Sequence, residues 1–378
     1  MSTTPIEVQA RATIGAAFAG LPVPDPKMLI RHLHSRDRGG EERIRKDLAH
    51  RNWQSLPAGF LESRWFSFCY LSPEGYRYYL PAALTAALDA DRTLAHSVVF
   101  GLRPSFWSLY YEGEDRDFRA KQSAFTPDQY RAVGTFLGFA FEQKPDLRHL
   151  AAQALRWGWA ALDTPALEAA QRYYHELHTY SHPEPGEPAV GALVAEIRAA
   201  FAETPYPGDH ELCGSDQGDE PAEYAMELRG LQWRSLHPEL LARNYAALSF
   251  LSDAGFRYFL PAFLIADLSG DESNADPVFH LTRGVSGPEG RLFDASTLQL
   301  VRSTLGPAAV GMFKRAARKF HQIDWRQYSL RRFAAFTQPE RLAIIRYLEH
   351  QATDEFNAAP VHRALEGYWR PSVAQPSV

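Results

Sequence analysis

One histidine in this sequence stands close to two acids and an arginine. His280 follows Asp276 and precedes Arg283, and Asp267 lies a short distance upstream. A histidine titrates near neutral pH, so it can act as a general base if the fold brings a carboxylate to one of its ring nitrogens. His280, Asp276 and Asp267 are therefore the candidate catalytic residues.

Two arginines are each followed by a tyrosine. Arg257 precedes Tyr258, and Arg77 precedes Tyr78. A guanidinium group can hold a carboxylate or phosphate through two parallel hydrogen bonds, so these four residues and Arg283 are the candidate ligand-binding residues. An internal arginine can instead pair with an acid, stack on aromatic rings and lock two helices together. We favour this structural interpretation.

A third group of residues mixes nitrogen, sulfur and oxygen donors. His210 and Cys213 lie among acids between Asp209 and Asp216. Zinc sites usually contain Cys and His pairs repeated at tight spacing, which this segment lacks. We therefore expect an acidic loop and assign no metal ligand and no cofactor. A metal-binding regulator remains an alternative.

The elements that must position these residues occur twice. The segment Leu71–Ala82, LSPEGYRYYLPA, recurs as Leu251–Ala262, LSDAGFRYFLPA, with eight of twelve positions identical. Average residue usage would give about one identity by chance. The chain is thus a tandem duplication, in which Arg77 and Arg257 occupy matched positions.

Further matched residues set the limits of the two copies. Trp53 and Trp233 are 180 residues apart, whereas Phe125 and Phe336 are 211 apart, so the second copy carries an insertion of about thirty residues within 282–329. We place a divergent first copy at residues 6–160, a linker helix and proline-rich linker at 161–189, the second copy at 190–370 and a C-terminal tail at 371–378.

The first copy lacks the candidate catalytic residues. At the places of His280, Asp276 and Asp267 it has Gly101, Ser97 and Ala87. A duplicated enzyme with one decayed site would show this difference, and so would a surface that drifted without a function. We favour drift.

Most of the sequence has helical signals. Ser72 and Pro73 resemble an N-cap and a first helical position, although Pro81 should kink or restart that helix. Thr126 to Gln129 and Thr337 to Glu340 are capping boxes. Only residues 97–102 and 277–281 favour short strands. We therefore predict a mainly α fold, with two homologous, mostly helical domains in tandem and at most a short β element in each.

Composition excludes several classes of protein. The 378 residues are 45% hydrophobic and 22% charged, with a net charge of −5. This balance gives no basic surface for nucleic acid or an anionic membrane, and no apolar window is long enough to span a bilayer. Two cysteines at unmatched positions argue against a disulfide framework. We expect a cytoplasmic protein.

The second copy resembles a bacterial domain family of unknown function. The likeness rests on LSFLSDAGFRYFLPAFLIADL at residues 248–268, DPVFHLT at 276–282, FAAFT at 333–337 and ALEGYW at 364–369. The first copy departs from this pattern, with SVVFGL at residues 97–102. The resemblance implies a fold unit and no particular reaction.

These observations favour a binding or protein-interaction module, with a protein or a small molecule as its partner. A phosphate-binding loop, a Gly-x-Ser-x-Gly elbow and a His-Glu-x-x-His motif are all missing from the sequence. The alternative is a hydrolase-like enzyme with one working site, around His280 in the second copy. The sequence does not determine the ligand or the oligomeric state.

Overall fold

A computed structural model of the chain forms two compact units, Met1–Glu176 and Leu177–Val378. The boundary falls inside the predicted linker, within a helix, and each unit contains one copy of the repeat. The structure describes residues 4–31, 38–89, 92–161, 164–183, 185–216, 218–270, 275–286 and 324–374, with a few isolated positions from 299 to 311. Most of the predicted insertion lies outside the described residues.

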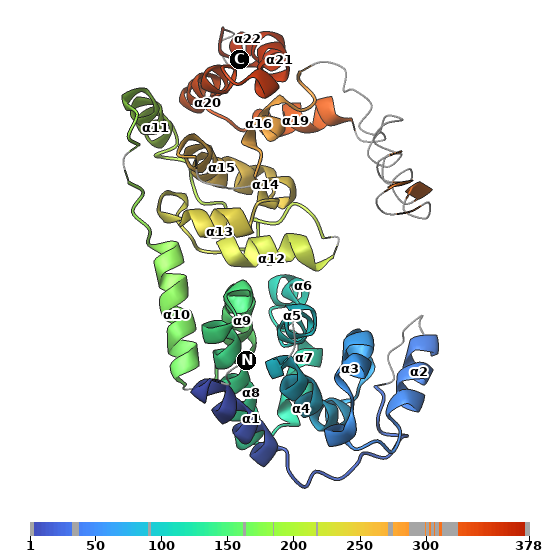
Figure 1. Cartoon of the computed structure of the whole chain (residues 1–378). Coiled ribbons are helices and arrows are strands. Elements are labelled where there is room, and N and C mark those ends of the chain that lie inside the picture. Colours follow the sequence, from blue (N-terminus) through green and yellow to red (C-terminus); the bar gives the residue numbers. More distant parts are fainter. Residues whose placement is uncertain are drawn as a thin grey trace. The chain divides into compact units, whose positions relative to one another are not determined.

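The first unit consists of helices, with a long connection between the first two (Figure 1). They are α1 (Pro5–Ala17), α2 (Arg38–Leu48), α3 (Ala58–Arg64), α4 (Pro73–Asp89), α5 (Arg92–Gly101), α6 (Phe106–Tyr111), α7 (Arg116–Ser123), α8 (Pro127–Gln143), α9 (Arg148–Gln153) and α10 (Pro165–His178), which crosses the boundary. A 3-10 turn covers Trp53–Ser55, and a π-helical turn covers Ala154–Gly158.

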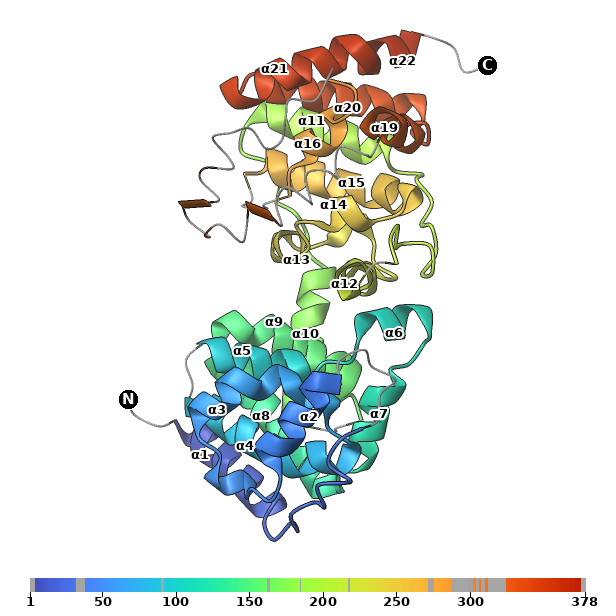
Figure 2. The same ribbon diagram turned by 90° about the vertical axis from the view of Figure 1, so that its right-hand side faces the viewer.

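The second unit repeats this plan (Figure 2). Its helices are α11 (Pro188–Ala200), α12 (Asp219–Leu228), α13 (Pro238–Arg243), α14 (Ala247–Phe250), α15 (Asp253–Leu268), α16 (Pro277–Thr282), α19 (Trp325–Phe333), α20 (Gln338–Gln351), α21 (Glu355–Ala364) and α22 (Arg370–Ala374). Trp233–Ser235 again forms a 3-10 turn, and Leu365–Trp369 a π-helical turn.

The fold is mainly α, as predicted, but the two predicted strands are wrong. Residues 97–102 lie mostly in α5, and residues 277–281 lie in α16. Asp276 explains the second error, because its carboxylate accepts a hydrogen bond from the Phe279 amide and caps a helix that opens on Pro277. In the described residues, the only β pairing consists of two isolated bridges, Ile30 with Leu71 and Cys213 with Leu251.

The prolines in the repeated motif do not end their helices. Helix α4 continues through Pro81 to Asp89, and α15 continues through Pro261 to Leu268. The residues on both sides of each proline are buried. Tertiary packing therefore holds the helix across a residue that local propensity disfavours.

The same three helices form the centre of each copy. In the first unit, α1 packs against α4 and α8, and in the second α11 packs against the matching helices α15 and α20. The buried faces are rich in alanine and aromatic residues, including Ala83 and Phe136 in the first copy and Phe263 and Tyr347 in the second. Among the described helices, none is both long and apolar enough to cross a membrane.

A serine fixes the start of the central helix in each copy. The hydroxyl group of Ser72 donates to the carbonyl oxygen of Met28 (2.6 Å) and accepts from the amide of Gly75 (3.0 Å). Ser252 does the same with the carbonyl oxygen of Glu211 (2.5 Å) and the amide of Gly255 (3.0 Å). One side chain thus caps a helix and ties a distant segment to it.

This contact explains the glycine of the Leu-Ser-x-x-Gly motif. A Cβ atom at Gly75 would lie 2.6 Å from the carbonyl oxygen of Leu29, and one at Gly255 would lie 3.0 Å from the carbonyl oxygen of Leu212. Neither carbonyl can move alone, because each accepts a backbone hydrogen bond from the motif serine. The motif needs glycine because two segments of backbone approach closely here.

A tryptophan closes each copy in the same way. The indole of Trp159 donates to the carbonyl oxygen of Leu102 over 2.9 Å, and that of Trp369 donates to Leu281 over the same distance. Both rings are fully buried and lie at the end of a π-helical turn. This hydrogen bond therefore ties the last turn of each copy to the end of α5 in the first copy and of α16 in the second.

We expect Gly75→Ala to lower the free energy of unfolding of the first unit by about 1–3 kcal/mol, because the new methyl group meets a backbone oxygen that is held in place. Gly15→Ala is the matched control, since a Cβ atom there has no neighbour within 4 Å and alanine favours the helix. Urea denaturation of both variants measures the difference. Equal stability of the two variants would contradict this account of the motif.

Candidate functional site

Arg257 forms an internal clamp between α15 and α20. Its Nε donates to both carboxylate oxygens of Glu340, at 3.1 and 3.0 Å. The carboxylate is 1% exposed and also accepts from the hydroxyl group of Thr204 (2.6 Å) and the amide of Thr337 (2.7 Å). Arg257 is 21% exposed, so the pair is largely removed from water.

The first copy keeps this clamp without the negative charge. Arg77 Nε donates to the amide oxygen of Gln129 over 2.7 Å, and Gln129 donates to the carbonyl oxygen of Ala17 over 3.1 Å. Both following tyrosines are buried: Tyr78 packs on Tyr79 and Tyr258 on Phe259. Tyr258 also donates to Gln232. These contacts fit the structural interpretation of the two Arg-Tyr pairs.

Arg257→Ala should lower the stability of the second unit by about 3 kcal/mol, because it leaves the buried Glu340 carboxylate without its counter-ion. Arg77→Ala should cost about 1 kcal/mol, because it removes one hydrogen bond to a neutral amide. Chemical denaturation of each variant tests the comparison between the two copies. A loss for Arg257→Ala no larger than that for Arg77→Ala would show that charge pairing does not stabilise the clamp.

The candidate catalytic acids are not brought to His280. Asp276 is exposed and uses its carboxylate to cap α16, accepting from the Phe279 amide at 2.8 Å. Asp267 accepts from the hydroxyl group of Tyr347 and the amide group of Gln351, both at 2.6 Å. Burial raises the pKa of Asp267. The two acids therefore have structural partners of their own.

His280 instead lines a cavity of about 570 Å³ in the second unit. Its half-buried ring lies beside Phe279 (5.2 Å between centroids) and Phe256 (6.2 Å) and makes no hydrogen bond in the described residues. Burial, followed by the positive charges of Arg332 and Arg283, lowers the pKa of His280 to about 3. The imidazole is therefore neutral at physiological pH.

The walls of the cavity come from the end of α14, the start of α15, and helices α16 and α19. They combine aromatic rings with charged groups. The aromatic residues are Phe250, Phe279, Trp325 and Tyr328. The charged residues are Arg283, Arg331, Arg332 and Asp253.

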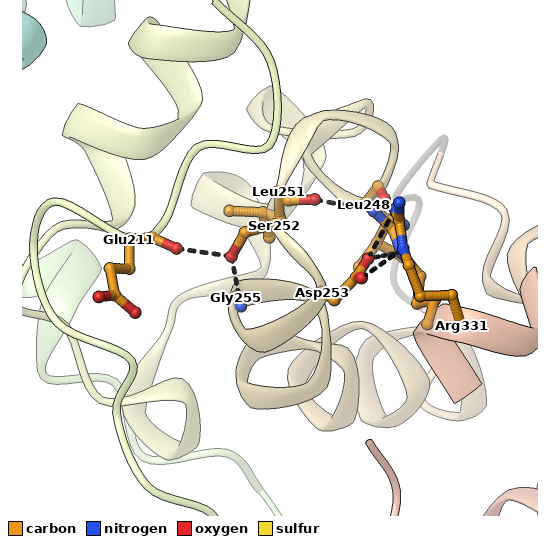
Figure 3. A network of polar contacts seen from close by, with 8 residues as sticks. Glu211, Leu248, Leu251, Ser252, Asp253, Gly255 and Arg331 are labelled. Atoms are coloured by element: carbon orange, nitrogen blue, oxygen red, sulfur yellow. Dashed lines mark hydrogen bonds and ion pairs between the residues drawn. The ribbon is translucent and has the colours of Figure 1, made fainter. Parts of the chain in front are cut away.

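A network around Asp253 builds one side of the cavity (Figure 3). The carboxylate accepts from Arg331 Nε at 2.8 Å and Arg332 Nε at 3.3 Å. Arg332 is buried and donates its other two nitrogens to the carbonyl oxygens of Leu248 and Leu251, both at 2.8 Å. This arginine satisfies the carbonyl end of α14 while it lines the cavity.

Arg283 forms a second feature of the cavity, in which a guanidinium group packs against aromatic rings. Its guanidinium carbon lies 3.5 Å from the ring centroid of Trp325 and 4.6 Å from that of Phe279. Such contacts hold a guanidinium in place. The cation and both rings line the cavity.

The first copy shows which positions correspond to this cavity. Lys121 lies over the ring of Tyr76 at 5.2 Å, as Arg332 lies over the ring of Phe256 at 4.4 Å. Tyr76 and Phe256 are matched residues of the repeated motif, so Lys121 on α7 corresponds to Arg332 on α19. One turn earlier, Asp117 then corresponds to Tyr328.

An ion-pair cluster occupies this place in the first copy. Arg31 pairs with Asp117, and Lys121 pairs with the same carboxylate at 3.0 Å. Arg31 corresponds to Gly214, because each donates its amide to the carbonyl oxygen of a matched residue, Tyr70 or Phe250. The second copy thus has a glycine and a tyrosine where the first has a charged pair.

Sequence reasoning found two of the cavity residues and missed the others. His280 and Arg283 line the cavity and are sequence candidates, whereas no residue of α19 is among those candidates. Arg331 and Arg332 are adjacent on that helix and follow Trp325 and Tyr328, which is a usable signal. They follow the insertion, so nothing local linked them to His280.

No group of three or more potential metal ligands occurs in the part of the chain that the structure describes. In the predicted acidic loop, Asp209 accepts from the hydroxyl group of Tyr206 (2.7 Å) and from Arg229 (2.9 Å). The thiol of Cys213 donates to the carbonyl oxygen of Ser215. These contacts shape the loop before α12.

Wild-type protein should lose stability more steeply than His280→Gln as the pH falls. The unfolded chain takes up a proton near the ordinary histidine pKa of 6.5, whereas the folded state does so only near its lowered value of about 3. Between about pH 7.5 and about pH 5 this difference costs the wild type about 2 kcal/mol. Urea denaturation of both proteins at the two pH values measures it, and parallel losses would contradict a neutral His280.

Comparisons with known proteins agree with the duplicated architecture. Neither a curated protein nor a solved structure matches the sequence. One family model, described as a family of unknown function (DUF6714), matches residues 7–163 and again residues 191–373. These segments contain both copies of the repeat, including the divergent first one. The chain therefore belongs to the DUF6714 family and contains its domain twice.

Proposed function

We propose that this chain is a binding module whose ligand site is the cavity of the second copy. The observation that carries the proposal is the difference between the copies: an ion-pair cluster of Arg31, Asp117 and Lys121 in the first, and a cavity of about 570 Å³ lined by matched residues in the second. That volume is typical of sites for small molecules. Aromatic walls with a few polar groups are typical as well.

Several polar side chains in the cavity could orient a ligand. They include the neutral ring of His280 and the hydroxyl groups of Ser249, Tyr328 and Ser329, none of which makes a side-chain hydrogen bond in the described residues. A neutral imidazole can donate from one nitrogen and accept at the other. Such a set suits recognition of a ligand by hydrogen bonds.

The hydrolase alternative has less support. His280 does line a cavity, but a base with a pKa of about 3 binds a proton too weakly to work near neutral pH. General-base catalysis also usually needs an acid to orient the imidazole, and both candidate acids have other partners. We therefore favour binding over proton transfer.

Blocking the cavity should weaken binding. Ser249 is exposed and lines the cavity, so Ser249→Trp should fill it without disturbing the core. Two fluorescent dyes of similar shape are suitable probes: neutral N-phenyl-1-naphthylamine and anionic 8-anilinonaphthalene-1-sulfonate. We expect the emission of at least one dye to rise when it binds wild-type protein. The apparent affinity of that dye should be about tenfold weaker for Ser249→Trp.

The matched control is Cys69→Trp, which places the same ring at the corresponding position of the first copy. It should leave dye binding unchanged. Circular dichroism and thermal melting should show that both variants are folded. If neither dye gives a signal that Ser249→Trp removes, the cavity is not a binding site and the proposal fails.

A further inference from the structure

The charges on the cavity wall are mostly positive. Among the described residues that line it, three are arginines and one is an acid, Asp253. That single carboxylate is shared by Arg331 and Arg332, at 2.8 and 3.3 Å. The other partners of Arg332 in the described residues are the neutral carbonyl groups of Leu248 and Leu251, so these three side chains keep one net positive charge.

Two further features at the cavity carry positive charge. Arg283 adds a guanidinium group held by Trp325, and the amino-terminal end of α15, which has partial positive charge, begins at the cavity. The same field is felt by His280, whose protonation Arg332 and Arg283 both oppose. A group of negative charge would be stabilised here.

The first copy shows an anion at the corresponding place. The carboxylate of Asp117 there pairs with Lys121 at 3.0 Å and also with Arg31. In the second copy the matched cation, Arg332, is kept, but Tyr328 replaces the acid. The first copy thus carries its own carboxylate where the second has an open, positively charged cavity.

The aromatic residues define the rest of the ligand. Trp325, Tyr328, Phe279 and Phe250 present ring surfaces to the same space. Flat apolar groups bind well against such walls, because ring contacts add to the burial of apolar area. The chemistry of the cavity therefore matches a molecule with one charged end and one flat end.

We infer that the cavity binds a small organic anion, with its carboxylate or phosphate among Arg283, Arg331 and Arg332 and its flat apolar body against the aromatic walls. This inference rests on the proposed function. It adds the chemical class of the ligand.

Two probes that differ only in charge test the inference. We would measure binding of 1-naphthaleneacetate and of its neutral counterpart 1-naphthaleneacetamide to the full chain by calorimetry. The acid should bind at least about tenfold more tightly, the ratio expected when an ion forms charge-assisted hydrogen bonds. 1-Naphthyl phosphate is the third probe, and the tighter of the two anions identifies the preferred charged group.

Arg331→Gln should reduce the preference for the acid over the amide several-fold, whereas Arg331→Lys should keep most of it. Arg346→Gln is the matched control, because Arg346 has the same exposure of 65%, pairs with Glu349 at 3.6 Å and does not line the cavity. It changes the net charge equally and should leave the preference unchanged.

Equal affinity for the acid and the amide would overturn the inference, and so would an equal effect of Arg331→Gln and Arg346→Gln. Failure of both naphthalene compounds to bind a protein that still takes up a dye in the cavity would overturn it as well. These outcomes leave the binding function intact. Loss of the proposed function itself would instead appear as the absence of any dye signal sensitive to Ser249→Trp.

Discussion

The hydroxyl group of one serine in each copy is the contact on which the other features depend. By capping the central helix and holding a distant carbonyl group, Ser72 and Ser252 fix where α4 and α15 begin. That starting point determines the direction of every later side chain on the helix. In the second copy it places Asp253 at the cavity and Arg257 against Glu340, so one cap positions both the ion-pair network and the clamp.

Comparison of the two copies shows one contact that they share and one arrangement in which they differ. Both copies keep a cation over the ring of the motif aromatic, Lys121 on Tyr76 and Arg332 on Phe256. Burying a cation is costly unless it has partners, so each copy must supply an acid or carbonyl groups around it. The first copy supplies Asp117 directly, whereas the second uses backbone carbonyls and a shared acid. The second arrangement borders a cavity of about 570 Å³.

The sequence predicted what local rules and the repeat determine. The duplication, the helical fold, the caps and the Arg257 clamp all follow from matched residues and short-range chemistry. The proximity of α16 and α19 could not be predicted in this way. A long insertion separates the two helices in sequence, and only tertiary packing brings them together. The same limit explains the strand errors: residues 97–102 and 277–281 have buried apolar side chains, which a short strand and a buried helix share. His280 and Asp276 are close in sequence, which suggested that they interact. The Asp276 carboxylate instead caps the helix by accepting from the Phe279 amide.

The electrostatics of the cavity explain why the His280 ring is neutral. Positive neighbours and burial hold the imidazole neutral, and a neutral ring costs little to desolvate compared with an imidazolium ion. The same positive field that opposes protonation of His280 favours an anion beside it. An anion in the cavity would in turn raise the pKa of His280, because it would stabilise the charged ring. Under the proposed function, anion binding and protonation of the His280 ring would therefore favour each other.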